Sequence, residues 1–265
     1  MELSDQTNEL FEVETEISPE NLKKLEAAIR TLSTTKDLKS WLGGKGRIQI
    51  GDPVVLPAVP LLKKSGEEIP ADIQLQLKQY DFYLVQFACS FQAGDNSRFH
   101  QANFEIKLIT EPQDPASPVA GAAMAYDLYP EKVEDEIKVS KNFTLGPDFK
   151  IKAKLGPVEA EASVVPLKIE NKQEYVVYNP KLEAFGRQAS DISWQFSRTK
   201  SHEIGGAQAL SVLVRKPKGS KVKAKLSLTA SLELVINLVA LPPIPLTTKW
   251  RKKGSAVEDP TIDLC

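Results

Sequence analysis

Residue types that could do chemistry are sparse and scattered in this chain. The two histidines among its 265 residues are His100, in a strand-like run, and His202, in a polar connection. No His-Glu-x-x-His, Cys-x-x-Cys or Gly-x-Ser-x-Gly sequence gathers them with a nucleophile or a metal ligand. Carboxylates are plentiful, but a glycosidase pair is matched only in space. We therefore expect a protein that is not an enzyme, with no catalytic residue, metal site, cofactor or small-molecule substrate.

The segment Gly43-Gly44-Lys45-Gly46 contains the residue types of a phosphate-binding loop. A phosphate-binding loop also needs a Ser or Thr directly after its lysine to reach magnesium, and a strand that leads into the loop. Here the lysine is followed by glycine, and no strand is predicted before it. We interpret these residues as a helix end and a turn.

A basic cluster is the strongest charge signal in the sequence. No acidic residue lies between Glu203 and Glu233 to offset it. Three of its lysines alternate along a predicted strand and would share one face at a spacing of roughly 6.6 Å. Such a row could contact phosphates or lipid headgroups, or it could simply protect an edge strand and keep a hairpin soluble, which is the interpretation we favour. The cluster comprises Arg215, Lys216, Lys218, Lys221, Lys223 and Lys225.

A second basic group surrounds Trp250, close to the end of the chain. It includes Arg251 and Lys252. The indole could anchor at a membrane interface or stack on a base, but we favour a side chain that covers the edge of a sheet. These three residues and the basic cluster are the candidate contacts for an anionic partner.

The element that would position the lysine row is a long strand over residues 222–238. Apolar residues occupy every even position, and every odd position except Val235 is charged or polar. A period of two predicts extended backbone with one buried and one exposed face. At about 3.3 Å per residue the run would span roughly 55 Å, so it either bends between two sheets or forms a long wall of one.

Other segments predict further strands. Residues 80–91 are apolar on both faces, which is typical of an interior strand. Residues 149–155 and 158–164 flank Gly156-Pro157, which predicts a hairpin with a type II′ turn. Short strands between frequent turns predict a mainly β fold, an antiparallel β-sandwich or two fused sandwiches, with a small N-terminal helical segment.

The N-terminal helix is predicted to begin at Ser18-Pro19, because serine caps free backbone N–H groups and proline is tolerated at the first helical position. Its apolar residues recur every three or four positions and form a candidate docking face. The members of this face are Leu22, Leu25, Ile29 and Leu32. The predicted division of the chain is an appendage over 1–50, a proline-containing connector over 51–78, β parts over 79–140 and 141–248, and a mobile tail over 249–265.

Composition suits a globular, cytoplasmic protein. The net charge is -1, with 42% hydrophobic and 26% charged residues, which argues against a chain that coats nucleic acid through bulk charge. The acidic N-terminus does not resemble a secretory signal, and two cysteines cannot build a disulfide framework. We predict an adaptor or accessory subunit that binds another protein through its helix or its 111–131 loop. The alternatives are a β protein that inserts amphipathic hairpins into anionic membranes and, with less support, a nucleic-acid-binding module.

Overall fold

The computed structural model describes residues 10–30, 46–94, 96–114, 116, 121–133, 181–199, 203–236, 239–252, 254–258 and 260–264. The predicted hairpin over 149–164 and the residues His202 and Leu32 lie outside these ranges. The side chain of Ile29 is likewise not among those described.

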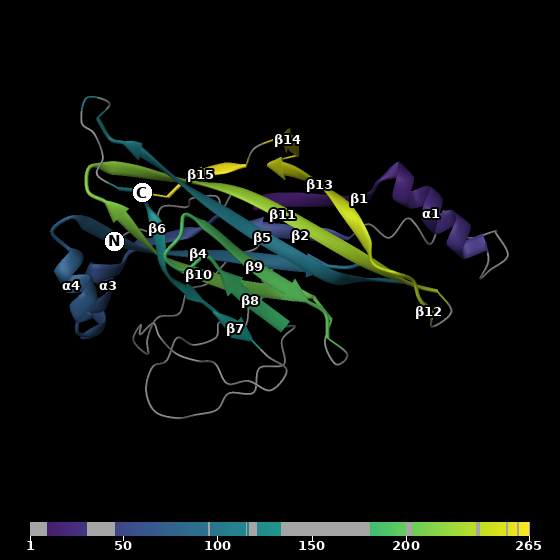
Figure 1. Cartoon of the computed structure of the whole chain (residues 1–265), viewed down its shortest axis with the longest axis horizontal. Helices are drawn as coiled ribbons and strands as arrows, with labels where there is room; N and C mark the ends of the chain where they lie inside the picture. Colours follow the sequence, from purple (N-terminus) through teal and green to yellow (C-terminus); the bar gives the residue numbers. More distant parts are fainter. Residues whose placement is uncertain are drawn as a thin grey trace.

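One antiparallel sheet dominates the described part of the chain (Figure 1). The strands along its main path follow the order β6-β10-β4-β2-β1-β13-β11-β5-β9-β8-β7, and β3, β12, β14 and β15 are attached to it. The bounds are β1 (Leu10–Ile17), β2 (Arg47–Gly51), β3 (Val54–Pro57), β4 (Tyr80–Gln92), β5 (Ser97–Pro112), β6 (Met124–Tyr129), β7 (Lys132–Val133), β8 (Lys181–Phe185), β9 (Asp191–Ser197), β10 (Gly206–Pro217), β11 (Ser220–Ile236), β12 (Val239–Ala240), β13 (Ile244–Lys252), β14 (Ser255–Val257) and β15 (Thr261–Asp263). The helices are α1 (Pro19–Arg30), α3 (Ala58–Ser65) and α4 (Ala71–Gln76).

The sheet nearly closes on itself and is barrel-like. Its first strand, β6, meets the turn between β8 and β9 near the other end of the path. The backbone N–H of Ala125 donates to the carbonyl of Ala189 (2.9 Å), and the N–H of Gln188 donates to the carbonyl of Ala125 (2.7 Å). The mainly β, antiparallel prediction is therefore confirmed, whereas the sandwich form is not, because the strands belong to one curled sheet.

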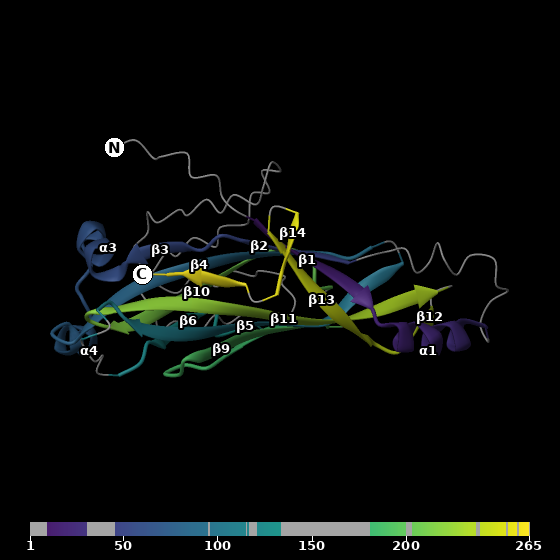
Figure 2. The same ribbon diagram turned by 90° about the horizontal axis from the view of Figure 1, so that it is seen from above.

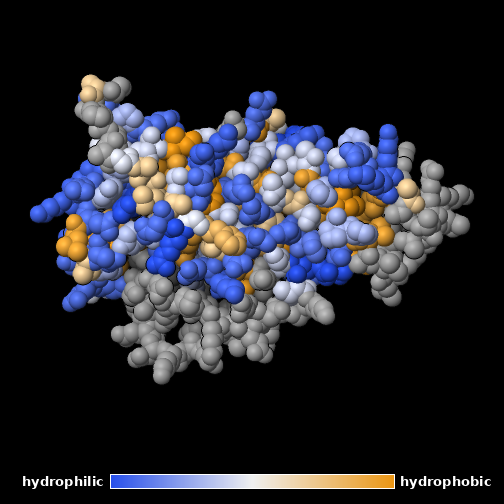
Figure 3. Space-filling view, viewed as in Figure 1, coloured by the Kyte–Doolittle hydropathy of each residue, from blue (hydrophilic) through white to orange (hydrophobic). Residues whose placement is uncertain are grey.

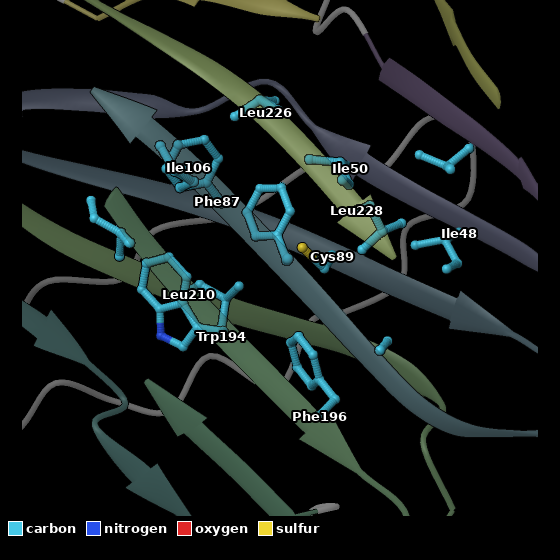
Figure 4. Packing of buried hydrophobic residues seen from close by; sticks show 14 of the residues in the cluster. Ile48, Ile50, Phe87, Cys89, Ile106, Trp194, Phe196, Leu210, Leu226 and Leu228 are labelled. Carbon is cyan, nitrogen blue, oxygen red and sulfur yellow. The ribbon is translucent and has the colours of Figure 1, made fainter. Parts of the chain in front are cut away.

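The barrel-like sheet is flattened, so that two walls face each other across an aromatic core (Figures 2 and 4). Phe87 and Phe91 belong to β4, which lies far from β5 and β9 along the sheet. Nevertheless the ring of Phe87 lies 5.7 Å from that of Phe104 on β5, and the ring of Phe91 lies 4.9 Å from that of Phe196 on β9. These contacts cross the interior and join the two walls, which explains how one sheet encloses a side-chain core.

Strand β4 is buried on both faces, as its sequence predicts. Val85 and Phe87 contribute to the central core, whereas Phe82 and Leu84 pack on the outer side. The outer side is covered by α3 and α4, which contribute buried residues such as Ile73. The proline-containing segment 51–78 thus forms β3 and two short helices that cover the outside of a core strand.

The long strand is confirmed and is a wall of a single sheet. Residues 220–234 of β11 pair with β5 along one edge. The other edge pairs in turn with β15, β13 and β12. Its even residues, for example Leu226 and Leu228, are buried in the core, as the alternation predicts.

The two ends of the described chain are part of the sheet, which differs from the predicted appendage and tail. Strand β1 lies between β2 and β13, and its Phe11 and Val13 are buried in the core. Strands β14 and β15 attach to β13 and β11, and the side chain of Ile262 on β15 is buried. The physical reason is that edges of the long strands would otherwise expose unpaired backbone groups.

Candidate functional site

The lysine row on β11 acquires acidic partners from other strands. Lys221 lies opposite Glu111 on β5, and Lys223 lies opposite Asp263 on β15. The Nζ of Lys223 is 2.8 Å from Oε2 of Glu111. Hydrogen bonding to Glu111, together with its charge, raises the pKa of Lys223 above its usual value. The tertiary structure therefore offsets the positive charge of a row that has no acidic neighbour in the linear sequence. Lys218 and Lys221 are exposed in the hairpin.

The membrane-inserting and nucleic-acid-binding alternatives stay predictions. Liposome leakage with anionic vesicles tests the first alternative. A salt-dependent gel shift tests the second alternative, because binding to phosphates weakens steeply with salt.

The second basic group is also paired. Trp250 is buried and lies edge-on to Phe11 of β1, with ring centroids 5.9 Å apart. The guanidinium Nε of Arg251 is 3.2 Å from Oε2 of Glu14. Lys252 places its Nζ 5.0 Å from the centroid of the Phe11 ring. Acidic residues of β1 meet basic residues of β13 here, because the two strands pair along most of their length.

The remaining members of the basic cluster, Arg215 and Lys216, lie apart from the lysine row. Lys216 is buried, and its Nζ lies 5.1 Å from the centroid of the Tyr83 ring. Arg215 extends toward α4, where its Nη1 donates to Oε1 of Gln76 at 2.6 Å. Its guanidinium carbon lies 4.6 Å from the centroid of the Tyr80 ring.

Arg215 is the centre of a surface cluster that we call the α4 corner. The cluster comprises Asp72, Leu75, Gln76, Tyr80, Tyr126 and Arg215. The hydroxyl of Tyr126 donates to Oδ2 of Asp72, which ties β6 to α4. Burial is the larger cause, and the hydrogen bond to Asp72 the next, of the rise in the pKa of Tyr126 to about 12. The phenol therefore stays protonated at neutral pH and remains a hydrogen-bond donor.

Leu75 projects from the α4 corner with 83% of its surface exposed. Figure 3 shows hydrophobic side chains at the end of the molecule where α3 and α4 lie. The sequence holds a signal for this exposure. Because residues two positions apart lie on nearly opposite faces of a helix, a helix that buries Ile73 must turn Leu75 toward solvent. The segment is predicted as a proline-containing connector, so the exposure of Leu75 was not predicted.

The predicted docking face of α1 is partly occupied by the protein itself. The helix begins as predicted, and the N–H of Asn21 donates to Oγ of Ser18 at 3.3 Å. Leu25 is buried in the central core cluster, whereas Leu22 is only partly buried. Leu25 therefore packs on the body of the protein and is not available to a partner in this arrangement.

A second charged cluster, at the opposite end of β11, was not predicted. Glu233 is 7% exposed, and its Oε2 lies 2.7 Å from Nε of Arg98 and 3.0 Å from Nη2 of Arg198. Glu203 approaches the same Arg98 at 3.6 Å. Arg98, Arg198 and Glu233 lie far apart in the sequence, so spacing along the chain carries no signal for the cluster. Buried between two guanidiniums, the Glu233 carboxylate holds the end of β11 against β5 and β9.

His100 lies beside this cluster on an irregularity of β5. The register between β5 and β11 shifts at Ser231 and Leu232, which leaves His100 without a partner residue on β11. Its carbonyl accepts a hydrogen bond from the N–H of Arg198 (2.9 Å). Its Nδ1 is buried and has no hydrogen-bond partner among the described residues. The arrangement is typical of a β-bulge that redirects the strand.

Within the described ranges, no group of three or more histidine, cysteine, aspartate or glutamate residues could hold a metal ion. Among the helices that the structure describes, none is both long and apolar enough to cross a membrane. No protein-family model matches the chain, and a search of curated proteins finds no relative.

Proposed function

We propose that this chain is a non-enzymatic β module that binds another protein and that it docks through the α4 corner. The observation that carries the proposal is the presentation of Leu75, 83% exposed, from a helix whose neighbours are held in place by hydrogen bonds. The role is that of a cytoplasmic adaptor or accessory subunit. The two facing walls would act as the layers of a sandwich-like scaffold behind the docking surface.

The residue types of the α4 corner support docking to a protein. A single exposed leucine is ordinary on a protein surface. Leu75, however, is accompanied by Tyr80, Tyr126 and Arg215, and tyrosine and arginine are enriched at the centres of protein interfaces. A partner could bury the leucine and cover the flat faces of the aromatic rings.

Preorganisation lowers the entropy that docking would cost. The Arg215 guanidinium is already oriented by Gln76 and by the Tyr80 ring, and Tyr126 is oriented by Asp72. Side chains that are fixed before binding lose little conformational freedom on binding. The corner therefore has the properties of a preformed contact surface.

The test compares co-purification by three forms of the full chain from the cells that naturally contain it. We expect a stoichiometric companion with the unmodified chain, loss of that companion with Leu75→Asp, and its retention with Ser255→Asp. Ser255 is an exposed residue of β14 and serves as the matched control. A photoreactive residue at position 75 should crosslink the same companion, and one at position 255 should not. An unchanged yield of companion with Leu75→Asp would contradict docking at the α4 corner.

A further inference from the structure

Arg215 is the exception among the arginine side chains that the structure describes, because no carboxylate contacts it. Every other described arginine forms at least one ion pair. These pairs are Arg47 with Glu12, Arg98 with Glu203 and Glu233, Arg187 with Asp127, Arg198 with Glu233, and Arg251 with Glu14. Arg215 instead contacts neutral groups, namely the amide oxygen of Gln76, the sulfur of Met124 and the ring of Tyr80.

These contacts leave the guanidinium of Arg215 incompletely satisfied. A guanidinium has one N–H on Nε and two on each Nη. Nη1 donates to Oε1 of Gln76 and Nη2 donates to Sδ of Met124, which leaves one N–H on each Nη. Nε is buried and has no hydrogen-bond partner among the described residues. The cost of partly burying this charge is therefore not offset by an opposite charge in the described part of the chain.

Three elements surround Arg215, and their acidic residues have other neighbours. Asp72 of α4 accepts a hydrogen bond from Tyr126, Asp81 of β4 lies opposite Lys216, and Asp127 of β6 pairs with Arg187. None of the three carboxylates forms an ion pair with Arg215 within the described ranges. An opposite charge for Arg215 has to be supplied from elsewhere.

The surroundings of the α4 corner add positive charge. The hairpin between β10 and β11 lies beside the segment that follows α4, where the backbone N–H of Lys218 donates to the carbonyl of Gln79 at 3.0 Å (Figures 1 and 2). Lys218 and Lys78 are both exposed. Exposed lysines attract an anionic partner and speed its association.

We infer that the α4 corner binds an acidic, apolar peptide segment, in which a carboxylate pairs with Arg215 and a neighbouring apolar side chain packs on Leu75. The inference rests on the proposed docking through the α4 corner and adds the chemistry of the partner. The two oxygens of a carboxylate can accept hydrogen bonds from the two remaining Nη N–H groups. Gln76, which orients Arg215, directly follows Leu75, so the charged contact and the apolar contact are adjacent.

A carboxylate suits the α4 corner better than a phosphate. Phosphate carries more charge and three acceptor oxygens, so its sites commonly gather several cations or backbone N–H groups. Among the members of the α4 corner, Arg215 is the one basic residue. Lys216, the next residue along β10, is buried and faces the opposite side of the strand.

Fluorescence anisotropy with the full chain tests the inference. Three pools of labelled peptides share leucine at their central positions, and the other positions hold Asp or Glu, Ser or Gln, and Lys or Arg. We expect the acidic pool to bind at least about tenfold more tightly than the neutral and basic pools. Arg215→Gln should weaken binding of the acidic pool at least about tenfold, because it removes a charge-assisted pair. The control Arg251→Gln removes the same charge from β13 and should bind as the unmodified chain does.

Three outcomes would overturn the inference. They are failure of the acidic pool to bind, equal binding of the acidic and neutral pools, and equal binding of the acidic pool by Arg215→Gln and the unmodified chain. Displacement of the acidic pool by anionic vesicles would also overturn it and assign Arg215 to a lipid surface. If Arg215→Gln loses its cooperative melting transition, Arg215→Lys replaces it, with a several-fold loss expected because an ammonium keeps the charge but not the paired N–H groups.

The inference and the proposed function fail separately. Binding of the neutral pool that Leu75→Asp abolishes and Arg215→Gln leaves unchanged would keep docking at the α4 corner and reject the carboxylate. Co-purification gives the same separation, because a companion lost with Leu75→Asp but retained with Arg215→Gln would reject the carboxylate alone.

Discussion

Replacement of Gly186 by alanine tests how the barrel-like sheet closes. Gly186 follows β8, has a φ of +95°, and precedes the two turn residues that bond to β6. A Cβ at this position would lie 2.0 Å from the carbonyl oxygen of Asp191 and 2.9 Å from Cα of Ile192. Both atoms belong to the backbone of β9, so neither can rotate away as the end of a side chain could.

The magnitude follows from two contributions. A side chain in the left-handed region costs about 1–2 kcal/mol, and forcing an extra carbon into a filled site costs about 1–3 kcal/mol. We therefore expect Gly186→Ala to lower the free energy of unfolding by about 2–5 kcal/mol. Gly219→Ala is the matched control, since Gly219 has a φ of +73° but no atom within 4 Å of its would-be Cβ. It should cost only the first contribution, about 1–2 kcal/mol.

Urea unfolding followed by tryptophan fluorescence measures both variants, because Trp194 is fully buried in the core. A separation between the two free energies of more than about 1 kcal/mol is expected, since it represents the added cost of overpacking. If the two variants lose the same stability within error, the turn accommodates the added carbon without cost, which would contradict a rigid closure.

Three further predictions concern buried groups. Burial raises the pKa of Asp127 above its usual value, so stability is lost as pH rises from the unfolded pKa to the folded pKa, and the full cost of the ionised form is present above both. Asp127→Asn should therefore be more stable than the unmodified chain at neutral pH. The advantage should be lost below pH 3.8, where the carboxyl is protonated in both the folded and the unfolded chain. A less stable variant in urea titrations at neutral pH would contradict this. In a Cys265→Ser background, Cys89 should react with a thiol reagent only as fast as the protein unfolds, because it is buried and its pKa is raised by that burial. Rapid labelling of the native protein would contradict this protection. Glu233→Ala should lower the free energy of unfolding by about 2–4 kcal/mol, since it removes the buried carboxylate that both arginines contact and leaves Arg98 only the more exposed Glu203. Glu203→Ala, at a side chain with 66% exposure, should change it by less than about 0.5 kcal/mol, and calorimetry that finds equal effects would disprove the distinction.

Strand periodicity was readable from the sequence because it is a local property. The alternation over 222–238 predicted both the long strand and its buried even positions, such as Leu226. The apolar character of both faces of 80–91 predicted an interior strand, and the structure supplies the reason, a core on one side and two helices on the other. The start of α1 at Pro19, directly after Ser18, followed from capping chemistry, which involves only neighbouring residues.

The pairing of strands that are distant in the chain could not be predicted from the sequence. The lysine row has no acidic neighbour in the sequence because Glu111 and Asp263 are remote, and only the register of β5 and β15 places them beside it. The same limit hid the α4 corner, where Arg215 meets a helix more than a hundred residues earlier in the chain.

Alternation along the chain is enough to show that the protein is mainly β and which residues of its long strands face the core, because alternation is set by the geometry of extended backbone. Pairing between distant segments is what makes the strands one nearly closed sheet and what joins the first and last described strands to it. Strand order and register depend on interactions summed over the whole molecule, and no short segment contains them.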